Sequence, residues 1–364
     1  MKVQDVMDHM EALAPLANSE DFDNTGLLVG DPQMEVKGIV VTLDTLESVV
    51  DEAIDSDCNM IVSFHPIIFK GLKSITGKNY VERVVMKALE HKIAIFAIHT
   101  ALDNAWHGVN GEICNRLGLE QRSMLMPKQG SILKLTTFVP KHAAEQVRNA
   151  LFGEGAGAIG NYSNCSFNID GTGTFNGNED SNPTIGEKGK TQTEEEVQIG
   201  LILEARLKGK VMKALMQAHP YEEVAYELIT LNNANQKLGM GMVGKLPEPM
   251  TEEAFLQHLK TTFGSGCVRH SALRGKPVQK VAVLGGSGAF AIGAAKAAGA
   301  DFYVTADLKY HDFFQAEGQL VLADIGHYES EQYTKDLILA HLSKKFTNFA
   351  LVLSQKNTNP ITYY

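Results

Sequence analysis

The sequence lacks several features that would place it in a common class of protein. It has only four cysteines in 364 residues and no C-x-x-C pair, which argues against a disulfide framework and a thiolate zinc site. No apolar run approaches the roughly 18 residues of a membrane span, and the opening MKVQDVMDHMEALAPL has no signal-peptide core. Basic residues are outnumbered 33 to 43, for a formal net charge of −10. We therefore expect a soluble, cytoplasmic protein without a membrane partner, and nucleic acid is disfavoured.

Two motifs of common hydrolases are also missing. The chain contains neither a G-x-S-x-G elbow nor a Walker A sequence, which disfavours serine-nucleophile hydrolases and P-loop NTPases. The composition is otherwise that of a folded globular chain, with 44% hydrophobic and 21% charged residues. At a prior of roughly 150 residues per domain, the length predicts two or three domains.

Strand and helix patterns alternate in the first and last thirds of the chain. Apolar runs such as VKGIVVTLD (36–44) and NMIVSFHP (59–66) lie between amphipathic segments, and the same pattern resumes from about Gly239. Uniformly apolar strands between helices predict a mostly parallel sheet that is covered on both faces. We expect one split α/β domain formed by residues 1–130 and 237–364.

The middle of the chain, residues 131–236, has a different pattern. Two strand–helix–strand patterns in about a hundred residues predict a small ferredoxin-like α+β module, inserted into the α/β domain at a surface loop. A stretch rich in Gly, Asn and Ser runs from Gly153 to Lys190, far longer than an ordinary connection of roughly 4–6 residues. We expect this stretch to be a functional loop or an interface, with an exposed, disordered loop as the alternative.

The apolar strands of the α/β domain run into polar residues that core packing does not require. Ligands of open α/β sheets bind outside the carboxyl ends of the strands, so we expect these residues to converge on one edge. Imidazole and carboxylate without thiolate suit Zn, Mn, Fe, Co or Ni. The strand-end residues are Asp44, His65, His99 with Asp103, the turn from Gly285 to Gly288, Asp307, and His327 with Glu331.

Two further features suggest an anionic substrate. The turn around Gly286 and Ser287 follows a strand and precedes a predicted helix, an arrangement that can cradle a phosphate. Lys70 and Lys73 follow His65 closely and could neutralise negative charge. The alternatives are an ordinary tight turn and two solvated lysines.

Several motifs in order resemble the Nif-three-like family of dinuclear-metal proteins, often named GTP cyclohydrolase 1 type 2 homologues. They are DNTGLLVG, SFHPIIFKGLKSI, AIHTALDN and DIGHYESEQ, and the resemblance spans the whole chain. In the middle segment, GAGAIGNYSNCSF, GTGTFNG and HPYEEVAYE resemble the inserted PII/CutA-like domain of the longer members. The resemblance implies a toroidal homohexamer with a pair of divalent metal ions per subunit and a site facing an internal cavity.

At the positions that match the family's motifs, the resemblance implies that His65, Asp103 and His327 are metal ligands and that Glu331 bridges two ions. The chain departs from the family at Phe64, which occupies the place of the first histidine ligand and cannot coordinate a metal. His65, Asp103 and Glu331 then surround one ion, whereas the other retains only His327 and the shared Glu331. We expect one firm metal position and one weak or empty position, hence one or two ions per chain.

The resemblance leaves the activity open between two main readings. The first is a metal-dependent hydrolase that acts on a phosphoester or a nucleotide-type substrate, with Glu329 or Glu331 handling the proton. The second is a non-catalytic metal-binding protein, used for storage or as a regulatory scaffold. DNA binding through the hole of the ring is a third class, and it conflicts with the net charge of −10. The candidate substrate contacts are Asn24, Lys70, Lys73, His99, Gly286 and Ser287.

Overall fold

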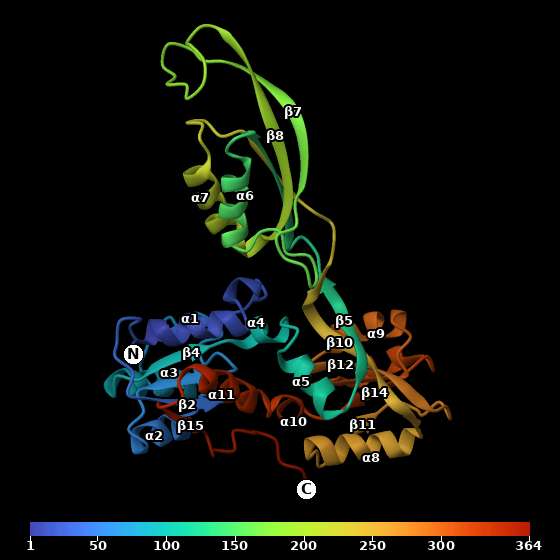
Figure 1. The fold of residues 1–364 in the computed structure, drawn as a ribbon. Helices are drawn as coiled ribbons and strands as arrows, with labels where there is room; N and C mark the ends of the chain where they lie inside the picture. The colour runs from blue at the N-terminus through green and yellow to red at the C-terminus, as the bar shows by residue number, and fades with distance from the viewer. The chain divides into compact units, whose positions relative to one another are not determined.

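The computed structural model describes all residues from 1 to 364 (Figure 1). The chain forms two compact units, one made of residues 1–127 and 236–364 and the other of residues 128–235. None of its helices is both long and apolar enough to span a membrane.

The first unit contains a five-stranded sheet in the order β1-β4-β3-β2-β15. Strands β15, β2, β3 and β4 run parallel to one another, and β1 pairs antiparallel with β4 at the edge. The strands are β1 (Gly26–Val29), β2 (Gly38–Thr42), β3 (Met60–Ser63), β4 (Ala94–Ala97) and β15 (Ala350–Leu353).

A second, six-stranded sheet in the order β11-β14-β13-β12-β10-β5 corrects the prediction of a single sheet. Strands β12, β13 and β14 are parallel, but β10 and β11 pair antiparallel with them. Antiparallel partners flank the second group of parallel strands on both sides, and the two groups belong to separate sheets. The strands are β5 (Glu120–Lys128), β10 (Asn235–Met250), β11 (Arg269–His270), β12 (Val278–Ser287), β13 (Phe302–Ala306) and β14 (Val321–Asp324).

The two sheets of this unit share one hydrophobic core. Ile39 and Met60 from the first sheet and Val281 and Phe302 from the second belong to the same cluster and are fully buried. One face of each sheet thus contributes to this shared core, whereas alternate strand residues such as Val40 and Ala282 pack in two separate clusters. The helices are α1 (Val3–Leu13), α2 (Glu47–Asp55), α3 (Tyr80–Glu90), α4 (His99–Asp103), α5 (Val109–Arg116), α8 (Glu252–Phe263), α9 (Ile292–Ala297), α10 (His327–Glu331) and α11 (Thr334–Lys345), with 3₁₀ turns η1 (Leu16–Asn18), η3 (Ala289–Ala291) and η4 (Tyr310–Ala316).

Local signals explain where several of these helices begin and end. Asn79 accepts a hydrogen bond from the Glu82 amide at the start of α3, and Thr251 accepts one from Ala254 at the start of α8. Gly264 ends α8 in the left-handed conformation, with φ of 62°. The predicted helix after the Gly285–Gly288 turn is instead a 3₁₀ turn followed by the short α9.

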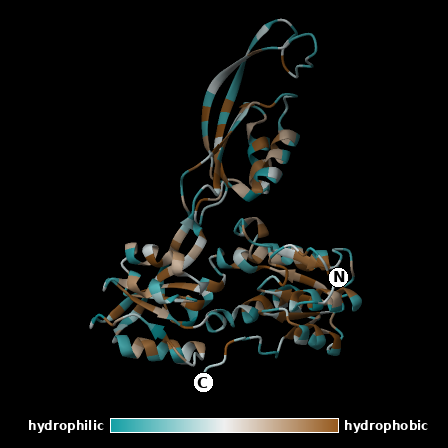
Figure 2. Cartoon of the chain, turned by 180° about the vertical axis from the view of Figure 1, so that it is seen from behind, coloured by the Kyte–Doolittle hydropathy of each residue, from teal (hydrophilic) through white to brown (hydrophobic).

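The second unit is an antiparallel sheet in the order β7-β8-β6-β9, with two helices on one face. Its β-α-β-β-α-β connectivity is that of the predicted ferredoxin-like module. Hydrophobic and hydrophilic residues alternate along its long strands (Figure 2). The elements are β6 (Ile132–Pro140), α6 (Ala144–Gly153), β7 (Phe167–Asn176), β8 (Thr191–Glu204), η2 (Ala205–Leu207), α7 (Lys208–Ala218) and β9 (Tyr226–Thr230).

The glycine-rich stretch is only partly a loop. Residues Phe167–Asn176 pair with β8 along their whole length, although this strand is largely exposed. Phe167, Ile169 and Phe175 alternate with polar residues, but the glycines and the polar residues around them are typical of a loop, and for this reason the sequence did not indicate a strand.

Candidate metal centre

The candidate centre lies at strand ends of both sheets in the first unit. His65 follows β3, and His99 follows β4 as the first residue of α4. On the second sheet, Asp307 directly follows β13, while His327 and Glu331 are the first and last residues of α10, after β14. The expected convergence at strand ends therefore occurs, but between two sheets and not at one edge of a single sheet.

Glu331 is the central side chain of the group. Its Oε2 atom lies 3.1 Å from His65 Nε2 and 3.0 Å from His327 Nε2. One ligand atom from each of the three residues lies within 4.8 Å of the others, so the group could hold a metal ion. The Glu331 side chain is 4% exposed, and its Oε2 makes no hydrogen bond of ordinary geometry.

Each of the three histidines is held by a carboxylate on its other ring nitrogen. Such contacts fix the ring orientation and direct Nε2 towards the site, as they do for histidine ligands of metals. No carboxylate was predicted to have this role. The pairs are His65 Nδ1 with Asp44 at 2.8 Å, His327 Nδ1 with Asp307 at 2.7 Å, and His99 Nδ1 with Asp23 at 2.8 Å.

The protonation of the centre reflects the close packing of these groups. Burial alone would lower the pKa of His65, but hydrogen bonds and charge from Asp44 and Glu331 outweigh it and raise the pKa to about 10. The pKa of His327 rises to about 11 for the same reasons, with Asp307 in place of Asp44. Burial alone would raise the pKa of Glu331, but the two histidines lower it to about 2. The three groups are therefore all charged at neutral pH.

Asp103 is the second carboxylate with an unsatisfied oxygen. Its Oδ1 atom is buried without a hydrogen bond. Burial raises the pKa of Asp103 well above its usual value, and the nearby charge of Glu331 adds to this effect. A buried polar atom without a partner is unfavourable, and a divalent cation would satisfy the Asp103 oxygen, whereas Glu331 pairs with the two protonated rings in the absence of metal. The imidazole and carboxylate donors therefore fit a divalent ion.

A cavity of about 250 Å³ adjoins these residues. His99, Asp103, His327 and Glu331 line its polar side. Phe22 and Phe290, which are 66% and 58% exposed, contribute aromatic rings to its lining. The arrangement suits a small ligand that has a polar end at the histidines and a flat or apolar part beside the phenyl rings.

Two amides of the predicted phosphate cradle already have hydrogen-bond partners. The amide of Gly286 donates to Ser330 Oγ at 2.9 Å, and the amide of Gly285 donates to Asn110 Oδ1 at 3.0 Å. Gly286 has a φ of 68°, and a Cβ there would lie 2.3 Å from Glu331 Oε1. The glycine is thus needed for the close approach of Glu331. Ser287 lines the cavity and donates to Asp307 at 2.8 Å.

Four other predicted residues lie outside the ligand group. Glu329 is buried and accepts a hydrogen bond from Asn359 at 3.1 Å, in the C-terminal segment. Asn24 donates its side-chain amide to the carbonyl of Ile68 and so joins two loops. Lys70 and Lys73 are exposed in the segment after β3 and do not line the cavity.

Phe64 is fully buried beside the centre. Its ring centroid lies 4.8 Å from that of His65 and 5.5 Å from that of His99. An apolar ring therefore stands directly next to the histidine group. The neighbouring Ser63 points its hydroxyl into the sheet, donating to the carbonyls of His65 and Phe96.

Comparisons with known proteins identify the family. The family model described as Duf34/NIF3 (NGG1p interacting factor 3) matches residues 1–360. The chain belongs to the Duf34/NIF3 family. Relatives from Halalkalibacterium halodurans and Bacillus subtilis are each 38% identical over 366 residues, covering 99% of this chain and 98% of theirs, and both are named GTP cyclohydrolase 1 type 2 homolog.

Solved structures of Duf34/NIF3 relatives share the fold. A Bacillus cereus protein related to NIF3 is 36% identical and aligns with a TM-score of 0.86, covering 100% of this chain and 99% of its own. A Staphylococcus aureus protein is 30% identical with a TM-score of 0.80 and the same coverage. The Nif-three-like resemblance drawn from the motifs is therefore confirmed.

Asp307→Asn is expected to weaken divalent-metal binding by about 10–100-fold, because Asp307 orients His327. Asp307 has a φ of 56°, which asparagine tolerates, so the backbone needs no change. The affinity is measured by calorimetric titration with Zn²⁺. The matched control is Asp57→Asn, since Asp57 also has a positive φ, of 50°, and contacts only Lys37 among the ion pairs. Equal losses in both variants would contradict a role for Asp307 at the centre.

Proposed function

We propose that this Duf34/NIF3 protein binds a divalent metal ion through His65, His327 and Glu331, with Asp103 as a further ligand. The observation that carries the proposal is the set of ligand atoms within 4.8 Å of one another, together with the unsatisfied Oδ1 atom of Asp103. The donor set suits Zn, Fe, Mn, Co or Ni. Phe64 supports one firm position and a second that is weak or empty.

We propose that the reaction is hydrolysis of a phosphoester or a nucleotide-type substrate. A divalent ion supplies Lewis acidity and lowers the pKa of the attacking water. Asp44 would hold the Nδ1 proton of His65, and Asp307 that of His327, so that the Nε2 atoms of both rings face the ion. His99, whose Nδ1 is held by Asp23, presents its Nε2 to the cavity as a group that can give or accept a proton. Phe22 and Phe290 would hold a flat ring and exclude water from one side.

The test for catalysis is turnover on a panel of nucleotides and phosphoesters by metal-loaded protein. His65→Ala should abolish any turnover, whereas Asp57→Asn, on the surface, should leave it unchanged. Metal binding without turnover across the panel would contradict the hydrolase and leave the second reading, a metal-storage or regulatory scaffold. The histidines held by carboxylates would bind metal both in a hydrolase and in a non-catalytic protein. Only turnover on the substrate panel therefore distinguishes the two hypotheses.

Assembly is a separate proposal. The family resemblance supports a homohexamer and a PII/CutA-like role for residues 131–236, and the β-α-β-β-α-β connectivity of the inserted unit is compatible with the latter. We also propose a cytoplasmic location and a small phosphorylated or nucleotide-like ligand. The mass of the purified protein in solution, by light scattering, tests the hexamer, and a monomeric mass would contradict it.

Metal binding is expected to release about two protons per ion near neutral pH. The pKa values of His65 and His327 are raised from 6.5 to about 10 and about 11, so both rings are protonated without metal and must lose that proton to coordinate. Metal affinity should therefore rise with pH up to about 10. The ion pairs of the protonated His65 and His327 rings with their carboxylates stabilise the metal-free fold fully below pH 6.5. This contribution to stability is lost as the pH rises through about 10, where the His65 ring loses its proton.

Calorimetric titration in buffers with different ionisation enthalpies measures the released protons. His327→Asn should reduce the number by about one, because one ring no longer titrates. A metal affinity that does not change with pH between 6.5 and about 10 would contradict the raised pKa values.

A further inference from the structure

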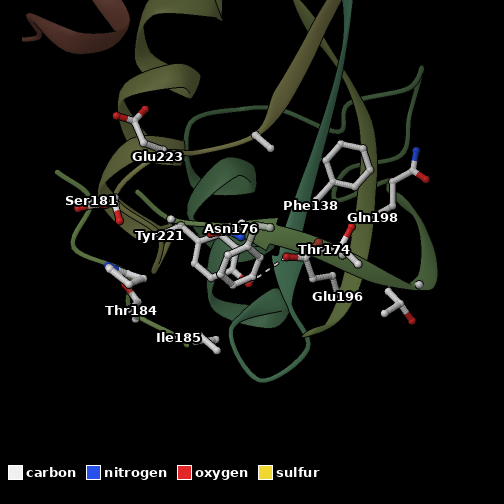
Figure 3. Close-up of a pocket in the computed structure, with 18 of the residues that line it drawn as sticks. Phe138, Thr174, Asn176, Ser181, Thr184, Ile185, Glu196, Gln198, Tyr221 and Glu223 are labelled. Atoms are coloured by element: carbon white, nitrogen blue, oxygen red, sulfur yellow. Dashed lines mark hydrogen bonds between the residues drawn. The ribbon is translucent and has the colours of Figure 1, made fainter. Parts of the chain in front are cut away.

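The inserted unit contains a larger cavity, of about 690 Å³, that lies entirely within residues 128–235 (Figure 3). This volume is in the range of pockets that enclose a small organic molecule. None of its lining residues is a proposed metal ligand, and those ligands belong to the other unit. The proposed metal chemistry therefore does not explain it.

The cavity lies on the sheet face opposite the helices. Successive side chains of a strand point to opposite faces, and Val197 and Ile199 of β8 pack in the core with α6 and α7. Glu196 and Gln198, which alternate with them, line the cavity. Their partners in register across the sheet are Gly171, Ile169 and Phe138, and these also line it. The segments 176–185 and 221–225 complete its lining.

The lining combines aromatic rings with carboxylates. Phe138, Phe175 and Tyr221 supply the rings, and the centroids of Phe175 and Tyr221 are 5.8 Å apart. Glu196, Glu222 and Glu223 are the charged residues of the lining, which includes no lysine, arginine or histidine. An anionic ligand such as a phosphate would meet only like charge here.

The motif His219–Glu222 fixes the acidic side of the cavity. The Tyr221 hydroxyl donates to Glu196 Oε1 at 2.9 Å, and burial raises the pKa of Tyr221, so it remains a donor (Figure 3). His219 Nδ1 accepts from the Tyr221 amide at 3.1 Å, and its Nε2 donates to the carbonyl of Phe138 at 2.9 Å. The Glu196 carboxylate is thereby held in one orientation.

Two glycines of β7 open the floor of the cavity. A Cβ at Gly173 would lie 2.2 Å from Glu196 Oε2, so a larger residue there would displace the carboxylate. A Cβ at Gly171 would meet no atom within 4 Å, which means that the space above this residue is empty. The glycines of the GTGTF segment thus make room for Glu196 and for a ligand, which explains their presence in a strand.

We propose that the inserted unit binds a small organic cation, an amine or amidinium attached to a flat apolar body. The cationic group would pair with the Glu196 carboxylate, and the apolar body would lie between the rings of Phe138, Phe175 and Tyr221, where cation–π attraction adds to the contact. A purely apolar ligand would leave the carboxylate desolvated without a partner, and an anion would be repelled.

Three probes of the same shape and different charge test this proposal on the full-length protein. Saturation-transfer NMR with benzylamine, benzyl alcohol and benzoate should give binding in the order amine, alcohol, benzoate. Glu196→Gln should weaken benzylamine binding by about tenfold, the loss of one charge-assisted contact, with a smaller effect on benzyl alcohol. Glu195→Gln is the matched control, since Glu195 is the adjacent residue of β8, is exposed and does not line the cavity.

Gly171→Leu provides a second variant that fills the cavity from an unobstructed position. It should abolish the signals of both benzylamine and benzyl alcohol while leaving the circular dichroism spectrum and metal binding unchanged. No benzylamine signal from the native protein, preferential binding of benzoate, or equal losses in the Glu196 and Glu195 variants would each overturn the proposal.

Discussion

Replacing Glu331 with glutamine is expected to weaken divalent-metal binding by at least about 100-fold, more than the loss of an orienting carboxylate would. Glu331 Oε2 is the atom within 3.1 Å of both Nε2 nitrogens, and its charge balances both protonated rings in the metal-free protein. The pKa values of His65 and His327 should therefore also fall towards 6.5 in this variant. Calorimetric titration with Zn²⁺ measures the first effect, and NMR titration of the rings measures the second.

Glu329→Gln is the control for this variant. Glu329 lies on the same helix, α10, and is buried to a similar degree, but its carboxylate contacts Asn359 and not the histidines. It should retain native metal affinity. If the two variants lost affinity equally, the effect would come from disturbance of α10, and Glu331 would not be a ligand.

Phe64→His is expected to raise the metal content of the protein from about one ion per chain towards two. Phe64 is fully buried with its ring beside those of His65 and His99, so a histidine there would place a nitrogen next to the existing group. Each ion would then have three donors, with His65, Asp103 and Glu331 on one ion and the new histidine, His327 and the shared Glu331 on the other. Three donors are enough for a metal site with an open position. Elemental analysis of protein purified without chelator or added metal gives the number of ions.

Phe64→Leu keeps the position apolar and should leave the metal content at the native value. Two ions per chain in the native protein would contradict the expectation that Phe64 has disabled one position. The hypothesis to test would then be a two-metal hydrolase.

Much of the fold could be predicted from local patterns. Strands such as β2 and β3 are continuous apolar runs, and helices such as α3 have an amphipathic face, so both were recognised within a few residues of their bounds. The division into two sheets could not be predicted. Strand β5, at the edge of the second sheet, mixes exposed and buried positions and gives no apolar run, so the sequence did not indicate it. Strand β7 is largely exposed and contains two glycines, so its short alternation of apolar and polar residues was not recognised as a strand.

The candidate site was predicted where motifs and strand ends coincided. His65, His327 and Glu331 do lie together, and Asp103 lines the adjoining cavity. The carboxylates that orient the histidines were not predicted, because contacts such as that of Asp23 with His99 join residues 76 apart in the chain. The amides of Gly285 and Gly286 also donate to residues distant in the chain, Asn110 and Ser330. The sequence alone could not show that these amides have partners.

We propose that His65, His327 and Glu331 hold a divalent ion. The most direct test is a crystal structure of the protein grown without chelator, with diffraction data collected above and below the absorption edge of the metal identified by elemental analysis. We expect an anomalous difference peak within bonding distance of both Nε2 atoms and the Glu331 carboxylate. Metal in the crystal with its anomalous peak elsewhere, or no metal after incubation with Zn²⁺ or Mn²⁺, would contradict it.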